Sequence, residues 1–343
     1  MKTLNFAIIG IGNIAPVHAA AIAATPGARL TAVATRNPDR GQSFAREHGA
    51  GWHADYRELL ARPDVDVVAI ASPHNLHLPM TEDAAAAGKH VLCEKPMACT
   101  VAECDAMIAA CERAGVLLGV TFQGRFEPLA AKLKALLDGG RLGRLLWASS
   151  NTVWYRDDAY YRSKPWRGTW AEEGGGVLIN QAIHAIDLFV WAAGMPQQIT
   201  AQARTLNHQI EVEDGALAIL GYDGGAMGLI QATTVAYPGY AERLEFYGTK
   251  GGVIYHKGEG RLEWHLLDPA EDGEHRSGVS SGAARPMDIT ADAHAALFRD
   301  FAAAIRTGGT PLVHGREGRR SLEVVEAIYR SSRSGAPIAL ARA

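Results

Sequence analysis

Short apolar runs alternate with stretches of helical periodicity through residues 1–122. The apolar runs predict strands at 4–9, 30–34, 65–71, 90–93 and 116–120. The run at 65–71 is almost entirely apolar, which is typical of a parallel strand covered on both faces. Helix starts are marked by Asn37-Pro38, an N-cap followed by proline, and by Thr100-x-x-Glu103, a capping box. This alternation predicts an α/β domain with a doubly wound parallel sheet of the Rossmann type.

The pattern changes after residue 122. Runs with strand character follow at 198–204, 216–222, 226–235 and 243–247, separated by turn sequences at 222–225 and 248–252. Helical periodicity returns at 291–306 and 315–332, and the polar, glycine-rich stretch at 268–286 predicts a mobile loop. We therefore expect a second domain over residues 123–343, of the α+β class, built on a largely antiparallel sheet with an open face.

Composition narrows the classes of partner. The 343 residues can bury two cores, and the net charge of −3 has both signs interspersed, so nothing indicates nucleic acid or an anionic membrane. No apolar stretch approaches the ~18 residues of a membrane span, and glycines interrupt the N-terminal run too early for a signal peptide. The four cysteines lack C-x-x-C spacing, which favours small core residues in a reduced, cytoplasmic protein. They are Cys93, Cys99, Cys104 and Cys111.

The strand predicted at 4–9 leads directly into Gly10-Ile11-Gly12-Asn13-Ile14-Ala15 and then into a helical stretch. A G-x-G-x-x-A sequence between a strand and a helix is the dinucleotide fingerprint. Gly10 serves the tight turn, Gly12 lets a pyrophosphate approach the backbone, and Ala15 allows close packing of helix on strand. The helix N-terminus offers free N–H groups and the positive end of its dipole to phosphates. This segment predicts NAD or NADP as the cofactor.

The end of the second predicted strand bears on the choice between the two cofactors. An NAD-specific domain usually has Asp or Glu there to bind the ribose 2′-hydroxyl. This chain has Thr35-Arg36-Asn37 and no acid before Asp39. Arg36 can pair with a 2′-phosphate and Thr35 can donate to it, so we favour NADP over NAD. Arg36 could instead stack on the adenine, which would serve NAD equally well.

Polar residues follow two further strands, at the edge where ligands bind in such sheets. Residues 72–77 read Ser-Pro-His-Asn-Leu-His, and Glu94-Lys95-Pro96 comes after the next strand. Most lysines are solvated surface residues, but the position of Lys95 at the ligand edge favours a role beside nicotinamide and substrate. For His74 and His77 we favour packing around the cofactor over metal binding, because no further ligands have metal-site spacing.

Residues 174–187 read Gly-Gly-Gly-Val-Leu-Ile-Asn-Gln-Ala-Ile-His-Ala-Ile-Asp. The glycines allow a close approach of the backbone, and a helix is predicted to follow them. On that helix Asn180 and His184 stand at i and i+4, so that both project from one face, and Asp187 follows one turn later. A polar pair on an otherwise apolar helix is suited to hold a general base in a dry pocket. A core histidine with satisfied hydrogen bonds is the alternative.

Together these motifs resemble the Gfo/Idh/MocA oxidoreductases, a family named for glucose–fructose oxidoreductase and inositol dehydrogenase. The resemblance covers essentially the whole chain and also includes Trp166-Arg167 and the segment 315–337. It implies that Lys95 and His184 are catalytic and that Asn180, often an aspartate in the family, orients the substrate. The chain departs from the family's Ser-Thr-Pro-Asn pattern at residues 72–75.

The predicted cofactor contacts come from the glycine turn, the strand ends and the Trp-Arg pair. They are Gly10, Gly12, Asn13, Ile14, Thr35, Arg36, Ser72, Pro73, Asn75, His77, Glu94, Lys95, Gln123, Trp166 and Arg167. The predicted substrate contacts are Lys95, Arg125, Tyr155, Asn180 and His184. Further candidates, with ordinary surface packing as the alternative, are Tyr160, Tyr161 and Lys164. No metal is expected.

These roles imply hydride transfer between nicotinamide and a hydroxyl or carbonyl carbon of a sugar, sugar derivative or cyclitol. His184 is expected to act as general base in oxidation, and Lys95 to hydrogen-bond the same oxygen, although Lys95 could itself transfer the proton. An NAD-dependent glycoside hydrolase and a non-catalytic dinucleotide-binding regulator are the alternatives. Because the second sheet has too little helix to cover both faces, we expect one face to be buried in a homodimer or homotetramer, which the resemblance also implies.

Overall fold

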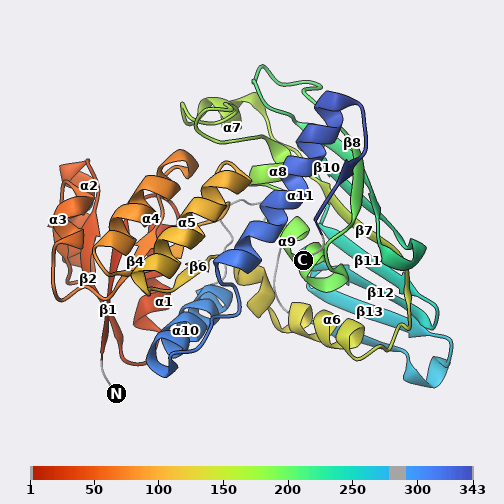
Figure 1. The fold of residues 1–343 in the computed structure, drawn as a ribbon, viewed down its shortest axis with the longest axis horizontal. Helices are drawn as coiled ribbons and strands as arrows, with labels where there is room; N and C mark the ends of the chain where they lie inside the picture. Colours follow the sequence, from red (N-terminus) through yellow and green to blue (C-terminus); the bar gives the residue numbers. More distant parts are fainter. Residues whose placement is uncertain (1–2, 278–290, 342–343) are drawn as a thin grey trace. The chain divides into compact units, whose positions relative to one another are not determined.

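The computed structural model describes residues 3–277 and 291–341, which form two compact units (Figure 1). The first unit extends to Gln123 and also includes helix α10 (Ala291–Thr307) and the chain that follows it up to Arg319. The second unit begins at Gly124 and takes in the chain from Arg320 onward. Within the described residues, no helix combines the length and the apolar character needed to cross a membrane.

The first unit contains a six-stranded sheet in the order β3-β2-β1-β4-β5-β6, and every neighbouring pair is parallel. Its strands are β1 (Leu4–Ile9), β2 (Ala28–Ala34), β3 (Gly51–His53), β4 (Val67–Ile70), β5 (His90–Cys93) and β6 (Leu118–Val120). All four residues of β4 are buried, as its apolar sequence predicts. The order, with β1 at the centre, confirms the predicted doubly wound fold.

Helices flank this sheet. They are α1 (Ala15–Ala23), α2 (Pro38–Glu47), α3 (Tyr56–Leu60), η1 (His74–Leu76), α4 (His77–Ala86), α5 (Val101–Ala114) and α10. The predicted helix starts are confirmed: the Asn37 side chain accepts from the backbone N–H of Arg40, and Thr100 and Glu103 form the reciprocal capping box. Helix α5 then ends at Gly115, whose left-handed backbone is typical of a helix end.

Helix α10 belongs to the first unit, although the sequence boundaries assigned its residues to the second domain. The ring of Phe298 lies 5.8 Å from that of Phe6 on β1 and 5.3 Å from the imidazole of His18 on α1. Phe298 and Phe301 are almost completely buried. The amphipathic pattern identified the helix correctly, but it could not indicate which of the two sheets its apolar face would cover.

The second unit contains a nine-stranded sheet in the order β14-β13-β12-β11-β7-β10-β9-β8-β15. Every neighbouring pair is antiparallel except β7 and β10. The strands are β7 (Leu145–Val153), β8 (Gln198–Arg204), β9 (Gly215–Gly221), β10 (Met227–Thr233), β11 (Arg243–Gly248), β12 (Gly251–His256), β13 (Arg261–Leu266), β14 (Gly273–Arg276) and β15 (Ile338–Ala339). This confirms the predicted, largely antiparallel sheet.

Helices of this unit pack on one face of the sheet, with α9 against β7 and β11 and α6 against β12 and β13. The helices are η2 (Gln123–Phe126), α6 (Pro128–Asp138), α7 (Asp158–Arg162), α8 (Val177–Asn180), α9 (Ile183–Ala193), η3 (Asp223–Gly225), η4 (Lys257–Glu259), η5 (Pro269–Glu271) and, from Arg320 onward, α11 (Gly315–Ser334). The stretch 268–286, predicted as a loop, contains η5 and β14, and residues 278–286 lie outside the described chain.

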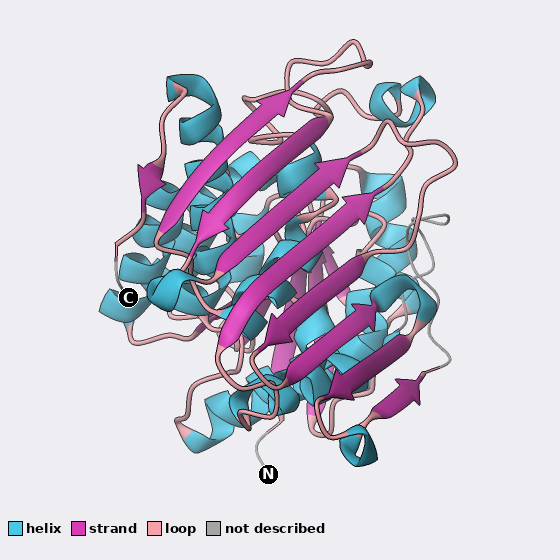
Figure 2. Cartoon of the chain, turned by 90° about the vertical axis from the view of Figure 1, so that its right-hand side faces the viewer, coloured by secondary structure: helices cyan, strands magenta, loops and turns pink. Residues whose placement is uncertain are grey.

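The opposite face of the sheet is open, and Figure 2 presents its central strands with no helix in front of them. Apolar side chains gather there on β7, β9 and β10: Trp147, Leu217, Ile219 and Met227 are each 41–56 % exposed. Met227 pairs directly with Trp147, and Leu229 with Ile219, so these side chains form one continuous surface. We call it the apolar half of the open face.

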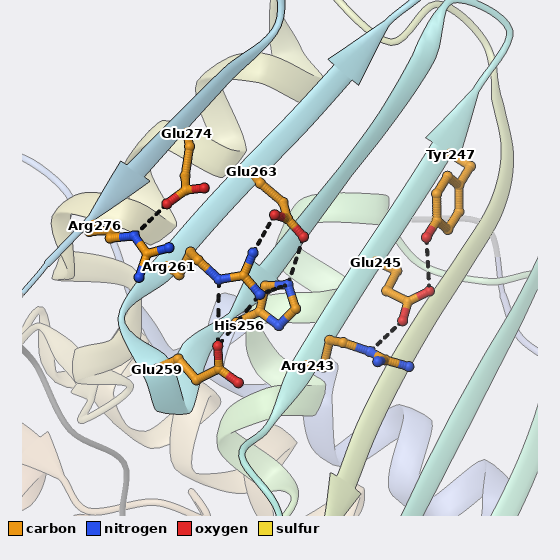
Figure 3. Close-up of polar contacts among 9 residues, drawn as sticks. All are labelled: Arg243, Glu245, Tyr247, His256, Glu259, Arg261, Glu263, Glu274 and Arg276. Atoms are coloured by element: carbon orange, nitrogen blue, oxygen red, sulfur yellow. Dashed lines mark hydrogen bonds and ion pairs between the residues drawn. The ribbon is translucent and has the colours of Figure 1, made fainter.

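Charged residues occupy the same face on β11 to β14 (Figure 3). On β11, Glu245 contacts both Arg243 and Tyr247. On the neighbouring strands Glu263 pairs with His256 and Arg261, and Arg261 also approaches Glu259 at the end of η4. On the edge strand, Glu274 pairs with Arg276. These charged pairs, most of them partly exposed, make this half of the open face polar.

Candidate active site

The glycine turn has the geometry that a dinucleotide requires. Gly10 follows β1 with φ +97°, and a Cβ there would lie 2.6 Å from the carbonyl oxygen of Ala71, so only glycine fits. At Gly12, by contrast, the nearest atom to an added Cβ is 4.0 Å away. No neighbour within the protein therefore requires a glycine at this position, whereas a pyrophosphate lying against the backbone would.

Helix α1 begins directly after this turn. Its N-cap, Ile14, has no side chain that could bond to the first N–H groups, and Ala15 is completely buried against the sheet. The first turn contains no acidic residue, so its positive dipole end is not neutralised locally. These features fit the phosphates of a dinucleotide, and they agree with the role predicted for the segment Gly10–Ala15.

The end of β2 carries the residues predicted to select between NAD and NADP. Arg36 is exposed, Thr35 is partly exposed, and Asn37 caps α2 through its side chain. No carboxylate occupies the position between Ala34 and Asn37. The strand end therefore presents a guanidinium and a hydroxyl group, and the first acid along the chain is Asp39 in the first turn of α2.

Backbone hydrogen bonds align the ends of three central strands. The N–H of Ala71 donates to Ile9 at 2.8 Å, and the N–H of Glu94 donates to Ile70 at 2.9 Å. Ser72 and the Glu94-Lys95-Pro96 segment therefore leave the sheet at the same edge as the glycine turn. Among the other predicted cofactor contacts, Asn13 and Asn75 are exposed, and Ile14, Ser72, Pro73, Lys95 and Gln123 are partly exposed.

His77 joins two of these strand ends. Its ring is completely buried, with Nδ1 3.0 Å from the carbonyl oxygen of Pro96 and Nε2 3.0 Å from that of Ser72. Burial lowers the pKa of this imidazole, and hydrogen bonds with the carbonyls offset only part of that effect. The ring lies between the carbonyl oxygens of the two segments, and its N–H donates to one of them, so His77 packs against the Lys95-Pro96 segment. The predicted contact of His77 with the cofactor stays a prediction.

Glu94 is fixed by a histidine that the sequence analysis did not identify. His18, on α1, is completely buried, and its Nε2 lies 2.8 Å from Oε1 of Glu94. Burial alone would raise the pKa of Glu94, but the hydrogen bond with His18 and the charges of His18, His294 and Lys95 lower it to about 2. The other carboxylate oxygen accepts from the backbone N–H of Lys95 at 3.1 Å. An ionised Glu94 thus anchors the backbone that carries Lys95.

The backbone of the glycine triplet at 174–176 packs closely against Glu213 and Tyr329 of the protein itself. A Cβ on Gly176 would collide with the carbonyl oxygen of Glu213, and one on Gly175 with the hydroxyl of Tyr329. The buried Glu213 carboxylate accepts from the N–H groups of Gly176 and Leu178 and from the Tyr329 hydroxyl, each at 2.9 Å. These contacts hold the start of α8. Burial raises the pKa of Glu213 to about 7, against the lowering effect of its hydrogen bonds.

The helix predicted after the glycines is divided, and the prediction of one continuous helix was wrong. Helix α8 ends at Asn180, and α9 begins at Ile183. Between them the N–H of Ala182 donates to Val177, five residues earlier, at 2.8 Å. Such a widened turn is frequent at functional sites. Asn180 and His184 are both partly exposed, but they belong to successive helices and do not share the regular i, i+4 relation.

Arg125, predicted as a substrate contact, forms a buried ion pair with Asp187. Its Nε and one terminal nitrogen donate to the two oxygens of Asp187, at 2.9 and 2.7 Å. Both side chains are at most 2 % exposed. The pair links η2 to α9, the helix that carries His184.

Aromatic and basic residues at 154–170 form a cluster within the second unit. The Arg167 guanidinium lies 3.8 Å from the ring centre of Tyr160 and 5.3 Å from that of Trp166. The Tyr160 hydroxyl accepts from Nε2 of Gln181 at 2.9 Å, which ties the cluster to the segment between α8 and α9. Tyr161 is buried, whereas Tyr155 and Lys164 are exposed.

The described residues contain no group of His, Cys, Asp or Glu arranged to hold a metal ion. None of the four cysteines forms a disulfide; Cys93, Cys104 and Cys111 are buried and Cys99 is partly exposed.

Four buried residues of the site were missed at the sequence level: His18, Glu173, Glu213 and Tyr329. His18, Glu213 and Tyr329 form hydrogen bonds with residues far away in the sequence, whereas Glu173 accepts one from the nearby Asn180. The available signals were an acid directly before the glycine triplet and an acid pair, Glu213-Asp214, before a strand. Neither signal indicates its partner.

A dinucleotide-type Rossmann unit followed by a mostly antiparallel sheet defines a class of nucleotide-dependent oxidoreductases. Residues 4–122 match the family described as "Oxidoreductase family, NAD-binding Rossmann fold", and residues 130–254 match the GFO/IDH/MocA C-terminal domain. The chain belongs to the Gfo/Idh/MocA oxidoreductase family. Its relatives in this family include NAD-dependent sugar and cyclitol dehydrogenases.

Among its relatives is the scyllo-inositol 2-dehydrogenase (NAD(+)) of Bacillus subtilis, which is 28 % identical over 97 % of this chain and 95 % of its own. The WlbA dehydrogenase of Bordetella pertussis, solved with NADH and UDP-GlcNAcA, is 32 % identical, with a TM-score of 0.86 and full coverage of both chains. A levoglucosan dehydrogenase, solved with NADH and levoglucosan, is 25 % identical, with a TM-score of 0.89 over 99 % of this chain and 100 % of its own.

The Glu213 anchor predicts a pH-dependent stability. The pKa of Glu213 is raised from its ordinary value of 4.5 to about 7 in the folded chain. Protonation of Glu213 therefore stabilises the folded state, and this contribution to the free energy of unfolding is lost as the pH rises from about 4.5 to about 7. Glu213→Gln cannot titrate, so its stability relative to wild type should rise between these limits. Denaturant unfolding across this range measures the difference.

Glu213→Ala leaves three donors without their acceptor and should lower the free energy of unfolding by about 3 kcal/mol. Glu211→Gln, two residues away and exposed, serves as the control and should change it by less than about 1 kcal/mol. A difference between wild type and Glu213→Gln that stays constant with pH would contradict the assignment.

Proposed function

We propose that this chain is an NAD(P)-dependent dehydrogenase or reductase acting on a hydroxyl or carbonyl carbon of a sugar, sugar derivative or cyclitol. The observation that carries the proposal is that one chain combines the dinucleotide turn Gly10–Ala15 with two reactive side chains, Lys95 and His184. A protein that only sensed the dinucleotide would need neither side chain. Relatives named for inositols, levoglucosan and a nucleotide sugar support a polyhydroxylated substrate.

The bound nicotinamide supplies the acceptor or donor of the hydride. His184 removes the proton from the substrate hydroxyl during oxidation and returns it in the reverse direction. Lys95 donates a hydrogen bond to the same oxygen and stabilises the negative charge that develops on it. Asn180 hydrogen-bonds the substrate and fixes its orientation. Lys95 is the second candidate for the group that transfers the proton.

The turn at Gly12 and the start of α1 hold the pyrophosphate, and Thr35 and Arg36 receive the adenosine ribose. The relatives' names point to NAD, which Arg36 can serve by stacking on the adenine. The exposed guanidinium and the missing carboxylate at the end of β2 favour NADP, and we keep the preference for NADP as the proposal to be tested.

Substitution of the two reactive side chains tests the proposed chemistry. Lys95→Met should abolish hydride transfer while leaving cofactor affinity largely intact. His184→Ala should lower turnover by about 10²–10⁴ because the general base is lost. Lys132→Met, at an exposed lysine on α6, is the control and should leave turnover unchanged. Near-native turnover of either active-site variant across the pH range would refute the assignment.

The cofactor preference is tested by Arg36→Ala. If Arg36 pairs with the 2′-phosphate, the variant should lose about tenfold or more in affinity for NADP and much less for NAD. Dissociation constants for both cofactors are measured on wild type and variant by fluorescence titration. Arg46→Ala, at the exposed end of α2, is the control. Equal losses for the two cofactors would mean that Arg36 only stacks, and the NADP preference would be dropped.

The open face of the second sheet predicts a homodimer or homotetramer. A second copy of this chain would bury the apolar half formed by Trp147, Leu217, Ile219 and Met227. Light scattering at micromolar concentration should give a multiple of the monomer mass, and Ile219→Glu should shift it toward the monomer. Leu267→Glu, at a side chain outside the strands that is 79 % exposed, should not. A monomer mass for wild type would count against this assembly.

A further inference from the structure

Asn180 is held by a buried carboxylate that has no part in the proposed reaction. Glu173 is 2 % exposed, and its Oε1 accepts a hydrogen bond from Nδ2 of Asn180. Its other oxygen, Oε2, accepts from the backbone N–H of Gly168 at 2.5 Å. Gly168 directly follows Trp166-Arg167, so one carboxylate links that segment to the end of α8.

These two bonds determine which way the amide faces. Both oxygens of Glu173 accept hydrogen bonds, so Asn180 directs its NH₂ group toward Glu173 and its carbonyl oxygen away from it. An aspartate at position 180 would instead direct an oxygen toward Glu173. Two carboxylates sharing a buried site cannot both ionise without strong repulsion, and one of them is kept protonated.

We propose that Glu173 is the positioning residue of Asn180: it aims the amide and makes asparagine, rather than aspartate, the residue that fits at this position. Glu173 acts through Asn180 and does not itself contact the substrate. The inference deepens the proposed function, since it gives the orientation in which Asn180 meets a substrate. It rests, however, on contacts within the second unit alone, and can be tested without a substrate.

Exchanging the two groups gives the test. In the double variant Glu173→Gln/Asn180→Asp, the amide introduced at position 173 can donate to the carboxylate introduced at position 180. The oxygen of the same amide still accepts from the N–H of Gly168. Both hydrogen bonds are therefore present in the double variant, but position 173 now donates to position 180 instead of accepting from it. In Asn180→Asp alone two carboxylates face each other. In Glu173→Gln alone the single amide oxygen cannot serve both donors.

Thermal unfolding of the free protein is measured at about pH 5 and about pH 8. The carboxylate pair in Asn180→Asp has its pKa raised in the folded state, so stability falls as the pH rises. Its Tm should be lower than that of wild type by about 5 °C at the higher pH and by clearly less at the lower pH. The double variant should recover to within about 2 °C of wild type at both values.

Two controls separate this account from general damage. Asn180→Ala removes the amide without adding a charge, so its loss should not depend on pH. Glu172→Gln, at the exposed neighbouring acid, should not rescue Asn180→Asp. If Asn180→Asp does not fold, recovery of a folded protein in the double variant supports the inference. Additive effects of the two substitutions, a loss independent of pH, or a double variant that also fails to fold would overturn it.

Turnover provides a second readout. The pH profile of kcat/KM should gain an additional titration in Asn180→Asp, and this titration should disappear in the double variant. Absence of dehydrogenase activity in wild type would refute the proposed function and would leave the unfolding measurements as the test of Glu173. If the double variant recovers the Tm of wild type but every variant keeps the wild-type pH profile of kcat/KM, Glu173 does not position Asn180 for the reaction, and this part of the inference is overturned.

Discussion

Two buried carboxylates, Glu173 and Glu213, and the partly buried Glu94 accept the hydrogen bonds that fix the segments carrying the proposed active-site residues. Glu94 is held by His18 and in turn anchors the backbone of Lys95, while Glu213 and Glu173 anchor the glycine triplet and Asn180. A buried donor left without its acceptor costs about 1–3 kcal/mol, so each segment has one strongly favoured arrangement. The segments that carry the proposed reactive groups are therefore held by residues that have no part in the proposed reaction.

Local sequence pattern was sufficient for five of the six strands of the first sheet and for four of the nine strands of the second; it missed β3, β7 and β12 to β15. The predicted strand 198–204 coincides with β8, and Asn37 and Thr100 cap helices as expected, because periodicity and capping depend on neighbouring residues. Helix α10 illustrates the limit of this reasoning. Its amphipathic pattern identified a helix, but its assignment to the first unit depends on contacts with Phe6 and His18, which lie near the other end of the chain.

The sequence predicted those parts of the candidate site in which neighbouring residues determine the backbone conformation. It did not predict contacts between residues that are far apart in the sequence. Gly10 has the positive φ that favours glycine, and Gly12 leaves open space at the place where its motif predicts a pyrophosphate. The glycines at 174–176, in contrast, accommodate Glu213 and Tyr329, and the break between α8 and α9 changes the relation of Asn180 to His184. Arg125 reads as a free cation in the sequence, and only the fold reveals its ion pair with Asp187.

The central claim is net oxidation or reduction of a polyhydroxylated substrate. The direct measurement incubates the purified protein with polyols, aldoses and sugar acids, each with NAD and with NADP, and follows the near-ultraviolet absorbance of reduced nicotinamide. The account predicts a substrate-dependent increase that is absent without protein. A glycoside hydrolase would release a free sugar from a glycoside with no net absorbance change. A regulator would bind the cofactor without turnover. No absorbance change with any substrate, from protein that binds the dinucleotide, would contradict the account.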